Sequence, residues 1–545
     1  MKTFSASFPS PGSSDSVRQK RLRGWKPYGV VFFAALLVLG VQLLQVQRPF
    51  RGHFASYQAT VMASIARNMV EEDFKEILLP KTNLLIVTPR KSYHLNQYPF
   101  PSLLVAVCVK FLGGPYEVWG RLQAILFNLL GAVLMFRIGA RLLGRAAGLI
   151  ASLLFLMLPF SVIYGQMFLC EPMAVFFLLA SVWLLARQGV PSRMATVMSA
   201  LCFSLAIANR THYLFFFPAL LYFLWIRSRR ILTCMVFLLL GGFLPAAWAW
   251  HTFVVGQLHP LQTHTNLFFQ AGSASVFGIR LLAGANYWRY ILDLFSNEML
   301  TPAVFPFVLL GLAGLWNSQK QVFRFFLLWT AGGLVLIFLA PKKIIDQDFY
   351  LYGLYPALLF LAACGIEKIS DVFSFLRRSR FLVAGTLLLM AVSARYFVHP
   401  IFQYPKEEKD VGAIGAWVQK ETSPGDIVIL SGSSAALLNY YVNRPVYGFS
   451  LQKEKVFSPY FMNRSFQRSE RDAIEAMKAA MHDDISLLEY LRGRGAGYLL
   501  ASSLDGQQGI SSRLLDYLKM NYSECPPGFD GVRLFNLRDK RQAEK

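Results

Sequence analysis

The chain has 545 residues, of which 55% are hydrophobic, 15% aromatic and only 16% charged. This composition excludes an ordinary soluble globular domain and indicates a polytopic membrane protein. The formal net charge of +23 does not require nucleic-acid binding, because much of the excess lies in short loops and in the N-terminal tail, where membrane topology accounts for it. The six cysteines lack the spacing of a metal site or of a disulfide framework.

Six clusters of Lys and Arg lie between long apolar runs. They cover Arg18–Lys26, Arg137–Arg145, Arg187–Arg193, Arg227–Arg230, Lys320–Arg324 and Lys368–Arg380. Cytoplasmic loops of membrane proteins carry such an excess of basic residues. The clusters therefore label one side of the membrane, and the less basic polar segments between them belong to the other side.

Eleven apolar runs suit membrane-spanning helices, which need about 20 apolar residues, or somewhat fewer where protein surrounds them. They are 27–47, 116–138, 146–164, 172–187, 194–209, 212–226, 231–250, 302–316, 325–341, 350–366 and 381–398. The first run is too long for a signal-peptide core, so we expect an uncleaved span. The sequence thus predicts a cytoplasmic basic tail at 1–26 and a transmembrane module at 27–398, with the C-terminus outside.

The first external loop, residues 48–115, contains two segments that suit interfacial helices. Pro99–Gly114 is short and contains Lys110, so a helix along the outer leaflet fits better than a span. His53–Val70 brings its apolar residues onto one helical face. Further external segments are expected at 165–171, 251–301 and 341–349.

The tail from 399 to 545 has a soluble α/β pattern. Predicted helices cover 407–421, 469–482, 485–493 and 511–522, and predicted strands cover 426–430, 497–502 and 531–537. The Gly432 region has no phosphate-loop spacing. We interpret the tail as a small external α/β domain that binds the acceptor or covers the site.

Acidic residues gather at one point of the first external loop, in Glu71-Glu72-Asp73. The simplest interpretation is a solvated helix end. The functional alternative is a carboxylate near the membrane surface that takes a proton from an acceptor. Arg67, Arg90 and His94 of the same loop could hold a phosphate.

Glu171 immediately precedes a predicted span and has no basic partner in its own loop. A glutamate at the edge of the hydrocarbon region is costly unless it is solvated, paired or protonated, so it is a functional candidate. The structural alternative is an N-terminal helix carboxylate ahead of a proline in the first turn. Both interpretations stay open at this point.

Two cationic sites lie on the external side of the predicted spans. Arg210 interrupts two apolar runs and could bind an anionic lipid headgroup, or could be an arginine that extends to the interface. Lys342 and Lys343 precede Asp346, Asp348 and Tyr350. Lysines outside run against the topology bias, which favours a specific anionic partner.

A set of short motifs completes the pattern between residues 27 and 400. They are Ile65-Ala-Arg-Asn-Met69, Leu95-Asn-Gln-Tyr-Pro-Phe100, Phe111-Leu-Gly-Gly114, Trp119-Gly-Arg121, Ala140-Arg-Leu-Leu-Gly-Arg145, Tyr164-Gly-Gln166, Glu171-Pro172, Asp348-Phe-Tyr350 and Tyr355-Pro356. Their order resembles the GT-C fold glycosyltransferases of the protein O-mannosyltransferase and aminoarabinose-transferase type.

The resemblance implies an enzyme that uses a polyprenyl-phosphate-linked sugar at the external membrane surface, inverts the anomeric centre and requires no catalytic metal or other cofactor. An acidic residue of an external loop would be the base, and cations would bind the lipid phosphate. The residues that supply this chemistry would be Glu171, Glu72, Asp73 or His53 as catalytic groups, and Arg67, Arg90, His94, Gln97, Arg210, Lys342, Lys343 and Tyr350 as substrate contacts.

The chain departs from the family pattern in three places. The family has an Asp soon after the first span, whereas His53-Phe-Ala-Ser-Tyr-Gln58 contains no acid. Gln97 and Tyr98 stand where the family has a basic residue or His, and Gln347 stands near an expected His. Glu171, Arg210 and Tyr350 match, so either the base has moved to His53 or to Glu71–Asp73, or the activity is lost or changed.

The sequence therefore leaves three functional hypotheses. The first is a glycosyltransferase of a bacterial inner membrane that acts on an envelope or secreted acceptor. The second is a catalytically silent relative that binds a lipid-linked glycan, which the missing early Asp supports. The third is a transporter or flippase, against which stand the soluble tail and the lack of acid–base pairs within spans.

Overall fold

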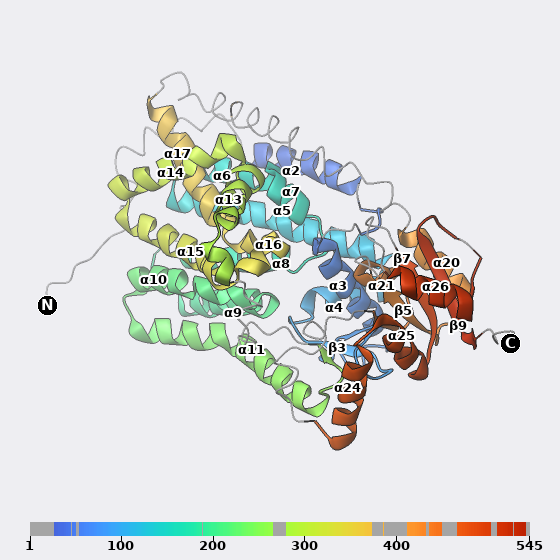
Figure 1. Ribbon diagram of the computed structural model, residues 1–545. Helices are drawn as coiled ribbons and strands as arrows, with labels where there is room; N and C mark the ends of the chain where they lie inside the picture. Colours follow the sequence, from blue (N-terminus) through green and yellow to red (C-terminus); the bar gives the residue numbers. More distant parts are fainter. Residues whose placement is uncertain are drawn as a thin grey trace.

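The computed structural model describes residues 27–44, 46–50, 54–187, 189–264, 279–372, 411–431, 435–449, 466–502, 510–526 and 528–540, together with the single residue 385. The predicted cytoplasmic tail and nearly all of the predicted span 381–398 lie outside these residues. The described chain forms a body of packed helices with a mixed β-sheet and its helices at one end, near the C-terminus (Figure 1).

The helical body follows the apolar runs of the sequence. Its helices are α2 (Pro27–Leu43), α5 (Tyr116–Leu142), α6 (Arg145–Met157), α7 (Pro159–Tyr164), α8 (Glu171–Ala186), α9 (Arg193–Asn209), η1 (Thr211–Phe216), α10 (Phe217–Ser228), α11 (Ile231–Leu258), η2 (Ile279–Ala283), α13 (Ala285–Asp293), η3 (Leu294–Met299), α14 (Thr301–Ser318), α15 (Lys320–Leu339), α16 (Pro341–Asp346), η4 (Asp348–Gly353) and α17 (Tyr355–Val372).

Each predicted span between residues 27 and 366 coincides with helical structure. Proline explains one interruption: Pro159 begins α7 just after α6 ends, because proline suits the first turn of a helix but not its interior. Within the described residues, α5, α11, α14 and α15 are long and apolar enough to cross a membrane, and several other apolar helices are shorter. The chain is thus a helical integral membrane protein, while the number of eleven spans stays a prediction.

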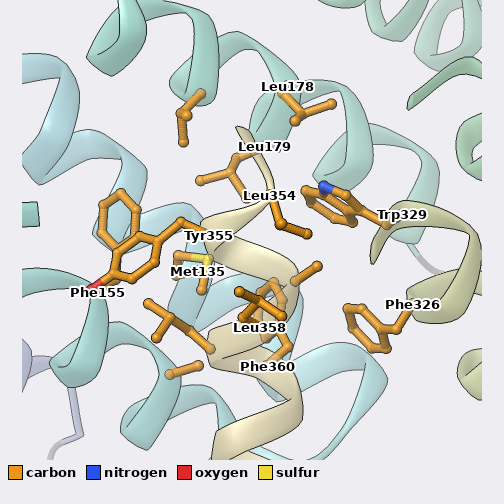
Figure 2. Packing of buried hydrophobic residues seen from close by; sticks show 14 of the residues in the cluster. Met135, Phe155, Leu178, Leu179, Phe326, Trp329, Leu354, Tyr355, Leu358 and Phe360 are labelled. Atoms are coloured by element: carbon orange, nitrogen blue, oxygen red, sulfur yellow. The ribbon is translucent and has the colours of Figure 1, made fainter. Parts of the chain in front are cut away.

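The centre of the helical body is an apolar core around α17. Tyr355 and Leu358 of α17 lie among Phe155 of α6, Leu179 of α8 and Trp329 of α15, all of them buried (Figure 2). Small residues bring α17 close to α14. A Cβ atom added at Gly311 of α14 would lie 1.9 Å from the carbonyl oxygen of Leu361. Such close backbone approach is typical of helix packing in membranes.

Two helices from the first external loop, α3 (Phe54–Glu71) and α4 (Phe100–Leu112), lie between the helical body and the sheet (Figure 1). Both were predicted as interfacial helices. α4 does expose Phe111 and Leu112 at its C-terminal end. In α3, however, Met62 and Ile65 are buried within the protein, so its apolar face packs against protein instead of meeting lipid.

The sheets combine distant segments of the chain. A small sheet has the order β1 (Lys81–Thr82), β3 (Ser92–His94) and β4 (Thr263–His264). A six-stranded sheet has the order β2-β6-β5-β7-β9-β8, formed by β2 (Leu84–Leu85), β6 (Val446–Gly448), β5 (Ile427–Ser431), β7 (Ala496–Ser502), β9 (Val532–Lys540) and β8 (Tyr522–Glu524). Strands β2, β6, β5 and β7 are parallel, and β9 and β8 are antiparallel to their neighbours.

The tail contains the helices and strands expected from its sequence. Its helices are α20 (Val411–Glu421), α21 (Ala435–Val442), α24 (Arg468–Ala480), α25 (Asp484–Gly493) and α26 (Ser512–Asn521). Sequence reasoning missed α21, β6 and β8. It also missed that β2, from the first external loop, pairs with β6. The predicted boundary at residue 399 therefore separates segments that share one sheet.

The contact between α14 and α17 gives a test of the packing. Gly311→Ala forces a methyl group against the Leu361 carbonyl, and overpacking of this kind costs about 1–3 kcal/mol. We expect a clear fall in the temperature at which the heated, detergent-solubilised protein loses its monodisperse peak in size-exclusion chromatography. Gly242→Ala in α11 is the matched control, because its added Cβ would meet nothing within 4 Å. Equal midpoints for both variants would contradict the proposed packing.

Candidate functional site

A buried ion pair joins the ends of α8 and α9. Arg210 Nε lies 2.6 Å from Glu171 Oε1, and the two side chains are 6% and 0% exposed. Pro172 sits in the first turn of α8, which starts the helix at Glu171. Arg210 is extended and follows the last helical residue of α9. The start of α8 and the end of α9 therefore bring a carboxylate and a guanidinium that are distant in the sequence into contact. We call this place the ion-pair corner.

The ion pair leaves hydrogen-bonding capacity unused. In the part of the chain that the structure describes, Glu171 Oε2 and Arg210 Nη2 are buried and have no hydrogen-bond partner, and the short contact between the two side chains is not a well-aligned hydrogen bond. Leaving a charged buried group partly unsatisfied is costly. Such an arrangement is suited to a ligand that supplies the missing partners.

Aromatic rings surround the cation. The Arg210 guanidinium lies over the Tyr350 ring at 5.0 Å and over the Phe349 ring at 5.7 Å. The His212 ring packs against that of Tyr350 at 4.9 Å, and His212 Nε2 is buried without a hydrogen-bond partner among the described residues. Cation–π contacts fix the guanidinium plane. The predicted contacts Arg210 and Tyr350 are thus brought together with Glu171.

A second acidic centre is formed by Asp348 at the start of η4 and Glu298 of η3. The Tyr164 hydroxyl donates a hydrogen bond of 2.6 Å to Asp348 Oδ1, and Asp348 is buried. Glu298 of η3 faces Asp348. Although Glu298 is exposed, desolvation, followed by the negative charge of Asp348, raises the pKa of its carboxyl to about 7. Sequence reasoning missed Glu298, because nothing in its local sequence distinguishes it from a surface glutamate.

Lys343 adds another cation near Arg210. Its side chain is half-buried. Burial lowers the pKa of Lys343, the carboxylate of Asp346 acts in the opposite direction, and the positive charges of Arg210 and Lys342 lower it further. Mutual repulsion of Lys343 and Arg210 means that they share one electrostatic environment. Lys342 is exposed.

The segment after β3 joins this corner to the first external loop. The Tyr98 backbone N–H donates to the Ala208 carbonyl at 3.1 Å, two residues before Arg210. Gln97, the residue before Tyr98, is buried. His94 lies elsewhere: it lines a cavity of about 200 Å³ between α3 and the end of β5, and its Nε2 contacts Asn96 at 3.2 Å.

The remaining predicted residues have other partners. Arg67 Nη1 donates to the Tyr440 carbonyl at 3.0 Å and the guanidinium stacks on the Tyr440 ring, so this cation ties α3 to α21. Glu72 pairs with Lys81 at 2.9 Å and Asp73 pairs with Lys110 at 3.0 Å.

These lysine pairs favour the solvated helix end over a catalytic acid. Arg90 is exposed, and His53 lies outside the described residues. Among the described residues, no group of three or more His, Cys, Asp or Glu side chains is arranged to hold a metal ion.

Comparisons with known proteins agree with this architecture. Residues 96–250 match the family model described as dolichyl-phosphate-mannose-protein mannosyltransferase. The matched segment contains Glu171, Arg210 and the Asn96–Tyr98 segment. A comparison with curated proteins found no match.

Solved membrane glycosyltransferases share the fold. ArnT from Cupriavidus metallidurans in the apo state superimposes with a TM-score of 0.58 at 15% identity, covering 93% of this chain and 98% of that chain. The Archaeoglobus fulgidus oligosaccharyltransferase tethered with an acceptor peptide gives 0.52 at 11%, covering 94% and 74%. The arabinofuranosyltransferase AftD from Mycobacteria gives 0.56 at 14%, covering 93% and 40%. The chain therefore has the GT-C fold, and the resemblance inferred from the motifs is confirmed.

The Glu298–Asp348 contact predicts a pH dependence of stability. The pKa of Glu298 is raised from 4.5 to about 7 in the folded protein, so the folded state binds a proton more tightly than the unfolded state does. Its contribution is present below about pH 4.5 and is lost as the pH rises through about 7. We expect the thermal midpoint to fall over this range, and to fall less in Glu298→Gln. An unchanged slope in the variant would contradict the contact.

Proposed function

We propose that this protein is a membrane glycosyltransferase that transfers one sugar from a polyprenyl-phosphate-linked donor to an envelope or secreted acceptor. The observation that carries the proposal is the buried Glu171–Arg210 pair with its unused hydrogen-bonding atoms. A phosphate is an anion whose oxygens match the guanidinium geometry. The solved ArnT bound to undecaprenyl phosphate, with a TM-score of 0.57 at 14% identity, supports a donor of this class.

The site has the charges that such a reaction requires. An acceptor hydroxyl attacks the anomeric carbon from the side opposite the phosphate, so the configuration inverts. The bond between that carbon and the phosphate oxygen breaks, and the lipid phosphate leaves with the electron pair. Arg210 and Lys343 stabilise the charge on the leaving phosphate. No metal ion is needed for this charge balance.

Glu171 is the proposed general base. Its carboxylate is paired with Arg210. When a donor phosphate takes over part of the Arg210 charge, the Glu171 carboxylate becomes more basic. Its free Oε2 can then accept the proton of the acceptor hydroxyl. In this proposal Glu171 takes the role of the Asp that the family has after the first span and that this chain lacks.

The topology supports chemistry on the external side. Helix α8 has 16 residues, so Glu171 lies about 24 Å from the basic turn at Arg187. Helix α9 returns from that turn to Arg210. The Arg227 guanidinium donates to the carbonyls of Arg187 and Gly189, so two basic turns meet at the same end. By the charge bias of membrane loops this end is cytoplasmic, as is the N-terminus, whereas the ion pair and the sheet are external. A bacterial inner membrane is the proposed location.

Glu171→Gln tests the proposal, because it removes the base while keeping the shape. We expect turnover to fall by about 10²- to 10⁴-fold, the usual contribution of a general base, with donor binding retained. Sugar transfer to envelope extract in isolated membranes, and binding of labelled polyprenyl-phosphate sugar to purified protein, measure the two quantities. Glu475→Gln at an exposed position of α24 is the matched control.

Arg210→Gln tests the other half of the pair. Loss of the phosphate contact should weaken donor binding and lower transfer by about 10²- to 10³-fold. Arg471→Gln, at an exposed position of α24, is the matched control. Donor binding by wild type without turnover on any acceptor extract would instead identify a silent relative. Substrate flux across sealed vesicles without sugar transfer would identify a transporter.

A further inference from the structure

An arginine-lined groove lies at the opposite end of α8 from Glu171. It has a volume of about 750 Å³ and is lined by Arg137 and Arg141 of α5, Arg145 at the start of α6, and Arg187 after α8. No carboxylate is among the described residues that line it. Four positive charges thus converge on one groove without a neutralising partner in its wall. We call it the arginine groove.

Packing of the helices creates this convergence. A Cβ atom at Gly139 would lie 2.5 Å from the Cα atom of Gly148, so α5 and α6 approach closely at their turn. Arg145 begins α6 just after this turn and lines the same groove as Arg141. Arg137 and Arg141 are four residues apart and share one helical face, where like charges repel. The arrangement therefore costs stability in the absence of an anion.

Two of the arginines contact other residues of the groove. Arg141 Nε donates to the Ala186 carbonyl at 3.2 Å, at the end of α8. The Arg187 guanidinium stacks on the Trp183 ring at 5.4 Å. These contacts use only part of the donor capacity of a guanidinium, which has five N–H groups. The remaining donors are available to phosphate oxygens, which guanidinium groups bind in a bidentate manner.

The wall beside the arginines is apolar. Trp183, Val190 and Pro191 line it, and Val190 is 65% exposed. An exposed apolar surface next to a cationic cluster at the membrane boundary matches a molecule with phosphates at one end and acyl chains at the other. Basic pockets between membrane helices on the cytoplasmic side bind such headgroups. The general bias towards basic cytoplasmic loops accounts for arginines in the turn, but not for their convergence on one groove.

We propose that the arginine groove binds the headgroup of an anionic phospholipid that carries two phosphates. Arg137, Arg141, Arg145 and Arg187 contact the phosphates, and the acyl chains lie along Trp183 and Val190. The proposal does not depend on the proposed sugar transfer, because it concerns the opposite end of the helices. A soluble polyphosphate is the competing ligand that shares the same charge.

The test uses the purified full-length protein in detergent, with binding measured by native mass spectrometry and by thermal midpoint. Cardiolipin, phosphatidylcholine and inorganic pyrophosphate are compared at equal phosphate concentration. We expect cardiolipin to bind and to raise the midpoint, and the double variant Arg141→Gln/Arg145→Gln to bind it at least about ten-fold more weakly. Lys320→Gln/Arg324→Gln removes two charges from the start of α15 and should bind like wild type.

Three outcomes would overturn the proposal. Equal loss of binding in the two double variants would mean that only overall charge matters. Stabilisation by pyrophosphate equal to that by cardiolipin would assign the groove to a soluble anion. Absence of cardiolipin binding to wild type would remove the site. If the Gln double variant does not fold, Arg141→Lys/Arg145→Lys is used instead. This variant keeps both charges but removes the bidentate guanidinium groups, and we expect it to bind cardiolipin several-fold more weakly than wild type.

Discussion

The buried ion pair between Glu171 and Arg210 constrains the rest of the molecule. Two charges removed from water are stable only if they stay in contact, so the N-terminal end of α8 and the C-terminal end of α9 must remain together. The aromatic residues of η4 cover the guanidinium, and the segment around Gln97 attaches to the same corner through Tyr98. Four parts of the chain therefore meet at one point that apolar packing alone would not define.

The helices that follow this corner also pack closely. Gly353 of η4 and Gly332 of α15 have no room for a side chain, because a Cβ atom at either would clash with Phe216 or its neighbours. The Phe349 and Tyr350 rings that cover the Arg210 guanidinium belong to the same short helix η4 as Gly353. A cation that is already held in place needs little free energy of reorganisation when an anion binds. Enzymes usually achieve electrostatic stabilisation in this way. In the proposed reaction, the unused donors of Arg210 and the half-buried Lys343 would contact the same phosphate.

The sequence predicts the helices and single candidate site residues, but it does not predict which residues these candidates contact. Hydropathy located the helices, and the cost of a charge beside an apolar run singled out Glu171 and Arg210 separately. Their pairing depends on how α8 and α9 pack, which no local pattern contains. For the same reason the sequence predicts a phosphate contact for Arg67, whose guanidinium donates to the Tyr440 carbonyl in the structure. The pairing of β2 with β6 of the tail likewise has no local signal in the sequence.

The missing acid after the first span becomes understandable from the positions of the other carboxylates. Helix α3 is attached to the tail through Arg67, and the acids that follow it are neutralised by lysines. The carboxylate that pairs with Arg210 is instead that of Glu171, while Asp348 and Glu298 interact with each other. The proposed anionic donor would meet additional repulsion if Asp348 and Glu298 were both ionised. Desolvation and the negative charge of Asp348 raise the pKa of Glu298 to about 7, so below that pH the Glu298 carboxyl is protonated and adds no second negative charge beside Asp348 to oppose the proposed phosphate.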